Sequence, residues 1–336
     1  MKRTIAAIAG LLTLAAPLIA LAALPMMGSF KVLQTIPAAG EGWDHASFDP
    51  ELKRLYVSHG AAVLTLDTKT GAVNPAFAAG NRVHAVITIP TTGEVMTTNG
   101  GDNTVRFFAA DTGRQIASLP AGRNPDAAIY DPATRLVLVM DNGAKGMTLI
   151  DPVTHRLIGT MDLGGKPESV AIDGVGRAFI NLEDRNEVAV VDIARRAVLA
   201  SYPLAGCQGP TGIAKVNHGW LVVACGNGVV KVLAGTGQEL ASYPVGRFPD
   251  AVIYDAKHKL AFVPSAVGGQ MIVINVGLGT QPSLAETVAT APGARTGAVD
   301  EKTGRVYLPT ADYNPAVGNA LPTVKPGTFH ILVVGK

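Results

Sequence analysis

The chain has 336 residues, of which 28 are Lys or Arg, 26 are Asp or Glu and 5% are aromatic. Two of the basic residues, Lys2 and Arg3, account for the formal charge of +2, and the rest of the chain has 26 basic and 26 acidic residues. A chain without excess positive charge lacks the feature that usually drives binding to phosphate backbones, so nucleic acid is not an expected partner.

The first 22 residues have the pattern of a secretory signal peptide. Lys2-Arg3 precedes an apolar stretch over residues 5–24, and Ala20-Leu21-Ala22 matches the small-residue pattern that signal peptidase recognises. An uncleaved membrane anchor is the less favoured alternative. We expect cleavage to leave a single domain over residues 23–336, in the periplasm or secreted. No later segment has the ~20 consecutive apolar residues of a membrane span.

After this leader, a short phrase recurs down the chain: a glycine, two or three spacers, often a proline, then a polar residue and an apolar run. Its copies begin at Gly40, Gly80, Gly122, Gly164, Gly206, Gly246 and near Gly293. A period of about 40–45 residues with several short strands is typical of a β-propeller blade. The sequence therefore predicts an all-β fold: a seven-bladed β-propeller of four-stranded antiparallel blades.

The third repeat shows the strands of one predicted blade most clearly. Its strands are expected at residues 126–131, 135–140, 146–151 and 156–163. Val, Ile, Leu and Tyr dominate these runs, and Gly, Asp, Asn or Pro separate them.

The last repeat supplies only three strands, at residues 295–300, 305–309 and 328–334. The missing fourth strand is available near the other end of the chain, where residues 29–37 resemble the outer strand of the other repeats. Pairing the two segments would close the ring and remove exposed sheet edges. We predict that this N-terminal strand completes the last blade.

Two motifs connect the repeats to a known family. Predicted second strands contain Tyr56-Val57-Ser58-His59, Met96-Thr97-Thr98-Asn99 and Phe179-Ile180-Asn181, and later turns contain Asp67-Thr68-Lys69-Thr70-Gly71 and Asp111-Thr112-Gly113. With these motifs the chain resembles the YVTN/YncE-like family of bacterial propellers. The resemblance implies the propeller fold. It leaves function open, since that family includes binding proteins and a single-stranded-DNA binder, and other seven-bladed propellers are enzymes.

Each repeat places one residue where strand one begins, and together these residues should ring one opening of the central channel. They are Asp44, His84, Asp126, Glu168, Thr211, Asp250 and Arg295. Convergent polar groups favour a ligand site. The structural alternative, hydrogen bonds within the turn or to the next blade, is favoured for the repeated Asp126 and Asp250. The irregular members are better functional candidates, together with the neighbouring Trp43 and His45.

Histidines gather in the first two blades, beside Asp44. Imidazole and carboxylate ligands together suit zinc, copper or iron. The candidate metal ligands are His59, His84 and Asp44, although no His-x-His or His-x₃-His spacing defines a geometry. A divalent metal is therefore a cofactor that the sequence allows without requiring it.

The two cysteines, Cys207 and Cys225, both fall in the fifth repeat. In an exported protein such a pair is expected to form a disulfide, which would fix the turn that carries Thr211. A redox pair is the alternative, but the Cys-x-x-Cys spacing is absent.

The usual catalytic signatures, Gly-x-Ser-x-Gly, His-Glu-x-x-His and the phosphate loop, are also absent. We therefore assign no catalytic residue and favour a monomer that binds a small ligand or a protein partner. One alternative is a metal-assisted hydrolase or lactonase-type enzyme using the acidic ring residues and His84 around a divalent ion. Others are an interaction scaffold using the loop 311–326, or single-stranded-DNA binding, which the family resemblance alone supports.

Overall fold

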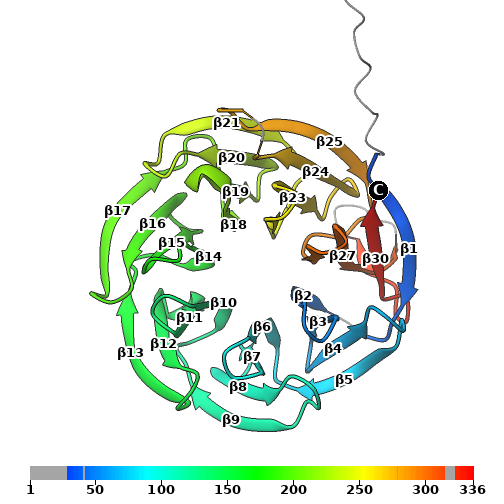
Figure 1. The fold of residues 1–336 in the computed structure, drawn as a ribbon, viewed down its shortest axis with the longest axis horizontal. Helices are drawn as coiled ribbons and strands as arrows, with labels where there is room; N and C mark the ends of the chain where they lie inside the picture. The colour runs from blue at the N-terminus through cyan, green and yellow to red at the C-terminus, as the bar shows by residue number, and fades with distance from the viewer. Residues whose placement is uncertain (1–28, 41, 278, 315–321) are drawn as a thin grey trace, which may run out of the picture.

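The computed structural model describes residues 29–40, 42–277, 279–314 and 322–336. Within these residues, seven four-stranded antiparallel sheets are arranged around a common axis (Figure 1). The predicted all-β, seven-bladed propeller is confirmed. The predicted signal peptide, residues 1–22, lies outside the described residues. None of the described helices is long and apolar enough to cross a membrane.

The two inner strands of each blade lie nearest the axis (Figure 1). The first strands are β2 (Trp43–Asp49), β6 (Val83–Ile89), β10 (Pro125–Asp131), β14 (Pro167–Ile172), β18 (Pro210–Lys215), β22 (Ile253–Asp255) and β26 (Ala298–Asp300). The second strands are β3 (Arg54–His59), β7 (Glu94–Asn99), β11 (Leu136–Asp141), β15 (Arg177–Leu182), β19 (Leu221–Cys225), β23 (Leu260–Ser265) and β27 (Arg305–Thr310).

The two outer strands of each blade complete its sheet. The third strands are β4 (Ala62–Asp67), β8 (Thr104–Ala109), β12 (Gly146–Asp151), β16 (Glu187–Asp192), β20 (Val229–Leu233), β24 (Gln270–Asn275) and β30 (His330–Gly335). The fourth strands are β5 (Val73–Ala79), β9 (Gln115–Pro120), β13 (Arg156–Asp162), β17 (Ala197–Pro203), β21 (Glu239–Pro244), β25 (Ser283–Ala289) and β1 (Lys31–Pro37). Two short 3-10 turns are η1 (Asn142–Ala144) and η2 (Asn217–Gly219).

The last blade combines both ends of the described chain. Strand β1 pairs antiparallel with β30, placing Val32 opposite Val334 and Thr35 opposite Leu332. In Figure 1 the blue β1 lies directly beside the red β30. The predicted closure is confirmed, and it pairs the strand edge that β30 would otherwise leave open.

Hydrophobic side chains fill the spaces between neighbouring blades. Along β11, Val137 and Val139 pack toward blade two, whereas Leu138 and Met140 pack against blade four. Successive side chains of a strand point to opposite faces of its sheet. Because both faces are buried, the inner strands have continuous apolar runs instead of alternating polar and apolar residues.

An aspartate recurs at the end of the first strand and stabilises the turn that follows. The carboxylate of Asp131 accepts hydrogen bonds from the backbone N–H and hydroxyl of Thr134, at 3.1 and 2.7 Å. Asp255 accepts one from the backbone N–H of His258 at 2.9 Å. An aspartate that satisfies its own turn is a structural requirement of each blade, which explains why it repeats.

Blade seven departs from the repeat, as its long loop suggests. Within the predicted loop 311–326, the short strands β28 (Tyr313–Asn314) and β29 (Thr323–Val324) pair antiparallel. Residues 315–321, between them, lie outside the described residues. The first strand of this blade, expected from residue 295, begins at Ala298, so Arg295 lies in the segment that leads into it.

Candidate functional site

The seven residues predicted to ring the opening occupy equivalent places in the structure, here called the ring positions. In blades one to five the ring position is the second residue of the first strand. At that point the pairing between the first and second strands shifts register in all five blades. Bulges of this kind redirect side chains and are common beside active sites. The repeat thus builds one redirected side chain per blade.

Hydroxyl groups of neighbouring blades hold the backbone at three ring positions. Thr296 donates to the carbonyl oxygen of Asp44 at 2.6 Å, and Ser58 donates to that of His84 at 2.7 Å. Thr98 donates to the carbonyl oxygen of Asp126 at 2.6 Å. These hydroxyl groups join neighbouring blades through the backbone of the ring positions, independently of the side chains of Asp44, His84 and Asp126.

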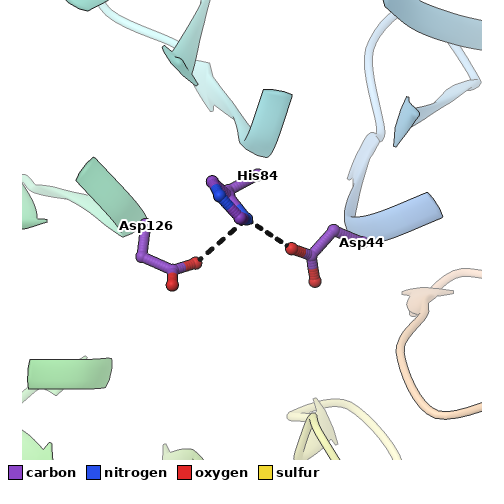
Figure 2. Close-up of side chains that lie close together, drawn as sticks. All are labelled: Asp44, His84 and Asp126. Carbon is purple, nitrogen blue, oxygen red and sulfur yellow. Dashed lines mark hydrogen bonds and ion pairs between the residues drawn. The ribbon is translucent and has the colours of Figure 1, made fainter. Parts of the chain in front are cut away.

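These three side chains point toward one another from adjacent blades (Figure 2). His84 Nδ1 lies 2.8 Å from Asp44 Oδ2 and 3.7 Å from Asp126 Oδ1. One potential ligand atom from each residue lies within 4.8 Å of the other two, so the three could hold a metal ion. Among the described residues, none donates a hydrogen bond to the Asp126 carboxylate, whose side chain is only 13% exposed.

The acidic side chains around this group have opposite pKa shifts. Burial alone would raise the pKa of Asp44, but the hydrogen bond with His84 and the charges of His45, Arg295 and His84 hold it below its ordinary value. Burial raises the pKa of Asp126 well above its usual range, and nearby carboxylates raise it further. A buried carboxylate among other acids is stabilised in its charged form by a bound cation.

Glu168 extends the acidic region into blade four. Burial, followed by the charges of Asp250, Glu183 and Asp44, raises the pKa of Glu168 to about 8. Asn142 donates a hydrogen bond to its carboxylate at 2.9 Å, which opposes that rise. A carboxyl group with such a pKa can be protonated near neutral pH, as a general acid must be.

Arg295 and Asp250 form a separate ion pair across blades six and seven. Arg295 Nε donates to Asp250 Oδ2 at 2.8 Å, and a terminal nitrogen of Arg295 lies 4.0 Å from Asp44 Oδ1. Although burial opposes it, the charges of Asp250 and Asp44 raise the pKa of Arg295. This pair leaves Asp44 and Asp126 as the carboxylates nearest to His84.

Other predicted site residues lie at different distances from this group. His45 Nε2 is 4.0 Å from Asp126 Oδ1, at the edge of the group. Trp43 is 4% exposed, and its ring packs against Phe329 and Tyr313. The Trp43 side chain therefore supports the wall of the site.

The structure does not bring His59 to His84 and Asp44, with which it formed the predicted metal set. The ring of His59 lies 2.8 Å from the carbonyl oxygen of Pro75, through Nε2, in its own blade. Asp126, and not His59, is the third residue of the group with Asp44 and His84. Because His59 ends a second strand, its side chain does not share the direction of the ring positions.

Blade five uses its ring position differently. The Thr211 hydroxyl donates to the carbonyl oxygen of Pro249 at 2.7 Å, which joins blade five to blade six. Beside it, Cys207 and Cys225 form the predicted disulfide, with both cysteines buried. The Thr211 hydroxyl is therefore engaged in a contact between blades, and its predicted role in ligand binding stays a prediction.

A cavity of about 270 Å³ opens beside the group, between blades seven, one and two. Its lining includes the ring residues Asp44, His84 and Arg295, together with Arg82, Tyr313 and Val324. Sequence reasoning missed these last three. Arg82 occupies a spacer of the repeated phrase, and the other two come from the hairpin that the repeat does not contain.

No protein-family model and no curated protein matches the chain. Several solved structures share its fold at low sequence identity. One is a chain of hydrazine synthase from Kuenenia stuttgartiensis, with 15% identity and a TM-score of 0.71 over 81% of this chain and 94% of that chain. A chain of the mitotic checkpoint complex has 13% identity and a TM-score of 0.72 over 91% of this chain and 95% of that chain. Streptogramin B lyase has 13% identity and a TM-score of 0.71 over 91% of this chain and 97% of that chain. These likenesses support the propeller fold alone, because proteins with this fold have unrelated functions.

Proposed function

We propose that this protein is an exported, ligand-binding propeller whose ring positions hold a divalent metal ion between Asp44, His84 and Asp126. The observation that carries the proposal is the convergence of two carboxylates and an imidazole, with ligand atoms within 4.8 Å of one another. The Asp126 carboxylate is largely buried beside Asp44 and receives no hydrogen bond from the described residues. A cation would neutralise both carboxylates at once.

The donor set narrows the choice of metal. One imidazole nitrogen and two carboxylate oxygens suit zinc, iron or manganese better than calcium, which prefers oxygen ligands alone. Three protein ligands would leave at least one coordination position for water or for a bound molecule. A site of this kind can recruit a ligand through the metal.

Two observations support an exported protein. The Cys207–Cys225 disulfide fits an oxidising compartment, extracellular or periplasmic, and the first residues have the pattern of a signal peptide. The motifs that resemble the YVTN/YncE-like family lie in second strands, including β3 and β7. Membership of that family is part of the proposal.

The proposal is tested by titrating the chelator-treated protein with Zn²⁺ and Mn²⁺ in a calorimeter. We expect one equivalent to bind, and Asp126→Asn and His84→Gln each to weaken the affinity by at least about 10-fold. Each replaces one of three ligands with a weaker neutral amide, and even the loss of a residue that only orients a ligand costs about 10–100-fold. His59→Gln is the matched histidine control and should retain wild-type affinity. Equal affinities in wild type and Asp126→Asn would refute the proposed site.

A second function is favoured by the raised pKa of Glu168. A metal-assisted hydrolase needs an ion that activates water and a group that can transfer a proton near neutral pH. Asp44, His84 and Asp126 would hold the ion, with Glu168 at the ring position of blade four and Asp250 at that of blade six. Metal-dependent hydrolysis of simple lactones would favour the enzyme. Metal binding without turnover would favour a binding protein.

A further inference from the structure

Arg82 differs from the other charged side chains near the metal-binding group. It lies in the cavity lining, just before β6, and its side chain is exposed. Within the described parts of the chain, its guanidinium forms no ion pair and no side-chain hydrogen bond. Its positive charge nevertheless acts on Asp126, whose pKa it lowers against the larger effect of burial. Arg82 therefore lines the same cavity as Asp44 and His84, and its guanidinium is not already paired within the described residues.

The remaining cavity lining combines a second cation with an apolar wall. Arg295 lies there too, but Asp250 already accepts its Nε–H at 2.8 Å. Tyr313 and Val324, both partly exposed, supply apolar surface, and Asp44 and His84 form the side shared with the metal-binding group. A ligand that fills the cavity would thus contact Arg82, an apolar wall and the metal site together.

We propose that this cavity binds a small organic monocarboxylate, with its carboxylate on Arg82 and its hydrocarbon part against Tyr313 and Val324. This inference rests on the proposed function, because the same site would place the ligand beside the metal ion. A guanidinium presents two parallel N–H groups that match the two oxygens of a carboxylate. No other free guanidinium lines the cavity among the described residues.

Charge balance favours a single negative charge on the ligand. A divalent ion would balance the carboxylates of Asp44 and Asp126, and Arg295 already balances Asp250. Arg82 is the remaining charge in the lining, so a monoanion is preferred over a dianionic phosphate. The cavity volume of about 270 Å³ lies just below the ~300–1,000 Å³ typical of drug-sized ligands. The ligand should therefore be a small metabolite.

The test uses isobutyrate and its neutral isostere isobutyramide, which differ mainly in charge. Trp43 lines the cavity, and the chain has only one other tryptophan, so Trp220→Phe leaves Trp43 as the fluorescent reporter. Titrations of the Trp220→Phe protein, with and without Zn²⁺, should show isobutyrate binding at least about tenfold more tightly than isobutyramide. Arg82→Gln in the same background should remove that preference, because the amide cannot pair with the charge of the carboxylate.

Arg123→Gln is the matched control, because Arg123 is an exposed arginine in the corresponding loop of blade three and contacts Gly143 instead of the cavity. Equal binding of isobutyrate and isobutyramide, or a preference that survives in Arg82→Gln, would overturn the inference. If Zn²⁺ binds and isobutyrate does not, the metal site stands and the inference is wrong. If isobutyrate binds through Arg82 without any Zn²⁺ binding, the inference stands and the proposed metal function is wrong.

Discussion

In blades one, two and three the ring positions carry Asp44, His84 and Asp126, whereas blade five carries Thr211 at the same place in its repeat. Both regions need a hydrogen bond to join each blade to the next. In the first region neighbouring Ser and Thr residues supply that bond, as Ser58 does for the carbonyl oxygen of His84 at 2.7 Å. In blade five the ring residue supplies it, since Thr211 donates to Pro249 at 2.7 Å.

The difference shows how a repeat can support a local function. Where a separate hydroxyl joins the blades, the ring side chain is available for charge and for metal or ligand binding. Where the ring residue itself joins the blades, as Thr211 does, its side chain is already engaged in that hydrogen bond. The blade-five region is also fixed by the Cys207–Cys225 disulfide. The first region should therefore determine binding, and the second should determine stability.

Removal of the Cys207–Cys225 disulfide should have the largest effect on stability. The double substitution Cys207→Ala with Cys225→Ala opens a loop closed over a sequence separation of 18 residues. We expect the free energy of unfolding to fall by about 3 kcal/mol, because the unfolded chain regains the entropy that the crosslink removed. Chemical denaturation of the variant and the wild type measures this change.

The Zn²⁺ affinity of the same double variant tests whether blade five also shapes the metal site. If blade five serves stability alone, the folded double variant should bind Zn²⁺ as tightly as the wild type. Thr211→Ser, which keeps the hydroxyl, is a conservative control in the same blade. A large loss of Zn²⁺ affinity in the disulfide variant would show that blade five also shapes the binding site, and the comparison would fail.

The sequence was sufficient to predict the ring of blades and its closure. The glycine phrase that begins at Gly80 and Gly122 marks each repeat, and residues 29–37 supplied the strand that the last blade lacked. The repeat also predicted the ring positions, because equivalent residues of equivalent strands point in the same direction relative to the axis. The sequence thus placed Asp44, His84 and Asp126 at one opening of the channel, but it proposed His59 and not Asp126 as the third metal ligand. The structure brings Asp126 to Asp44 and His84.

The details of the site depend on contacts that do not repeat. His59 shares a blade with Asp44, but its ring lies against the carbonyl oxygen of Pro75, and nothing in the residue spacing indicates that direction. Tyr313 and Val324 reach the cavity from a hairpin that exists only in blade seven. Arg82 occupies a spacer position, where the repeat sets the backbone and leaves the side chain unspecified.

Glu168 carries an ionisable group at the ring position of blade four, whereas Thr211 at the same position of blade five carries a hydroxyl. The pKa of Glu168 is about 8 in the folded protein, against a usual value of 4.5. Between about pH 5 and pH 8 the folded protein retains a proton that the unfolded chain has released. Stability should therefore decrease as pH rises through that window, in protein freed of metal by chelator.

Glu168→Gln should remove much of this pH dependence, because the amide stays neutral at every pH in the window. At pH 8 we expect the variant to be more stable than the wild type by about 2 kcal/mol, less than the full pKa shift implies because solvent reaches part of the carboxyl group. At pH 4.5 the two proteins should unfold at similar denaturant concentrations. Glu51→Gln, at an exposed carboxylate far from the ring positions, should follow the wild type at both pH values. A wild-type stability that stays constant from pH 5 to 8 would show that Glu168 ionises normally, and the case for it as a proton donor beside the metal would then be lost.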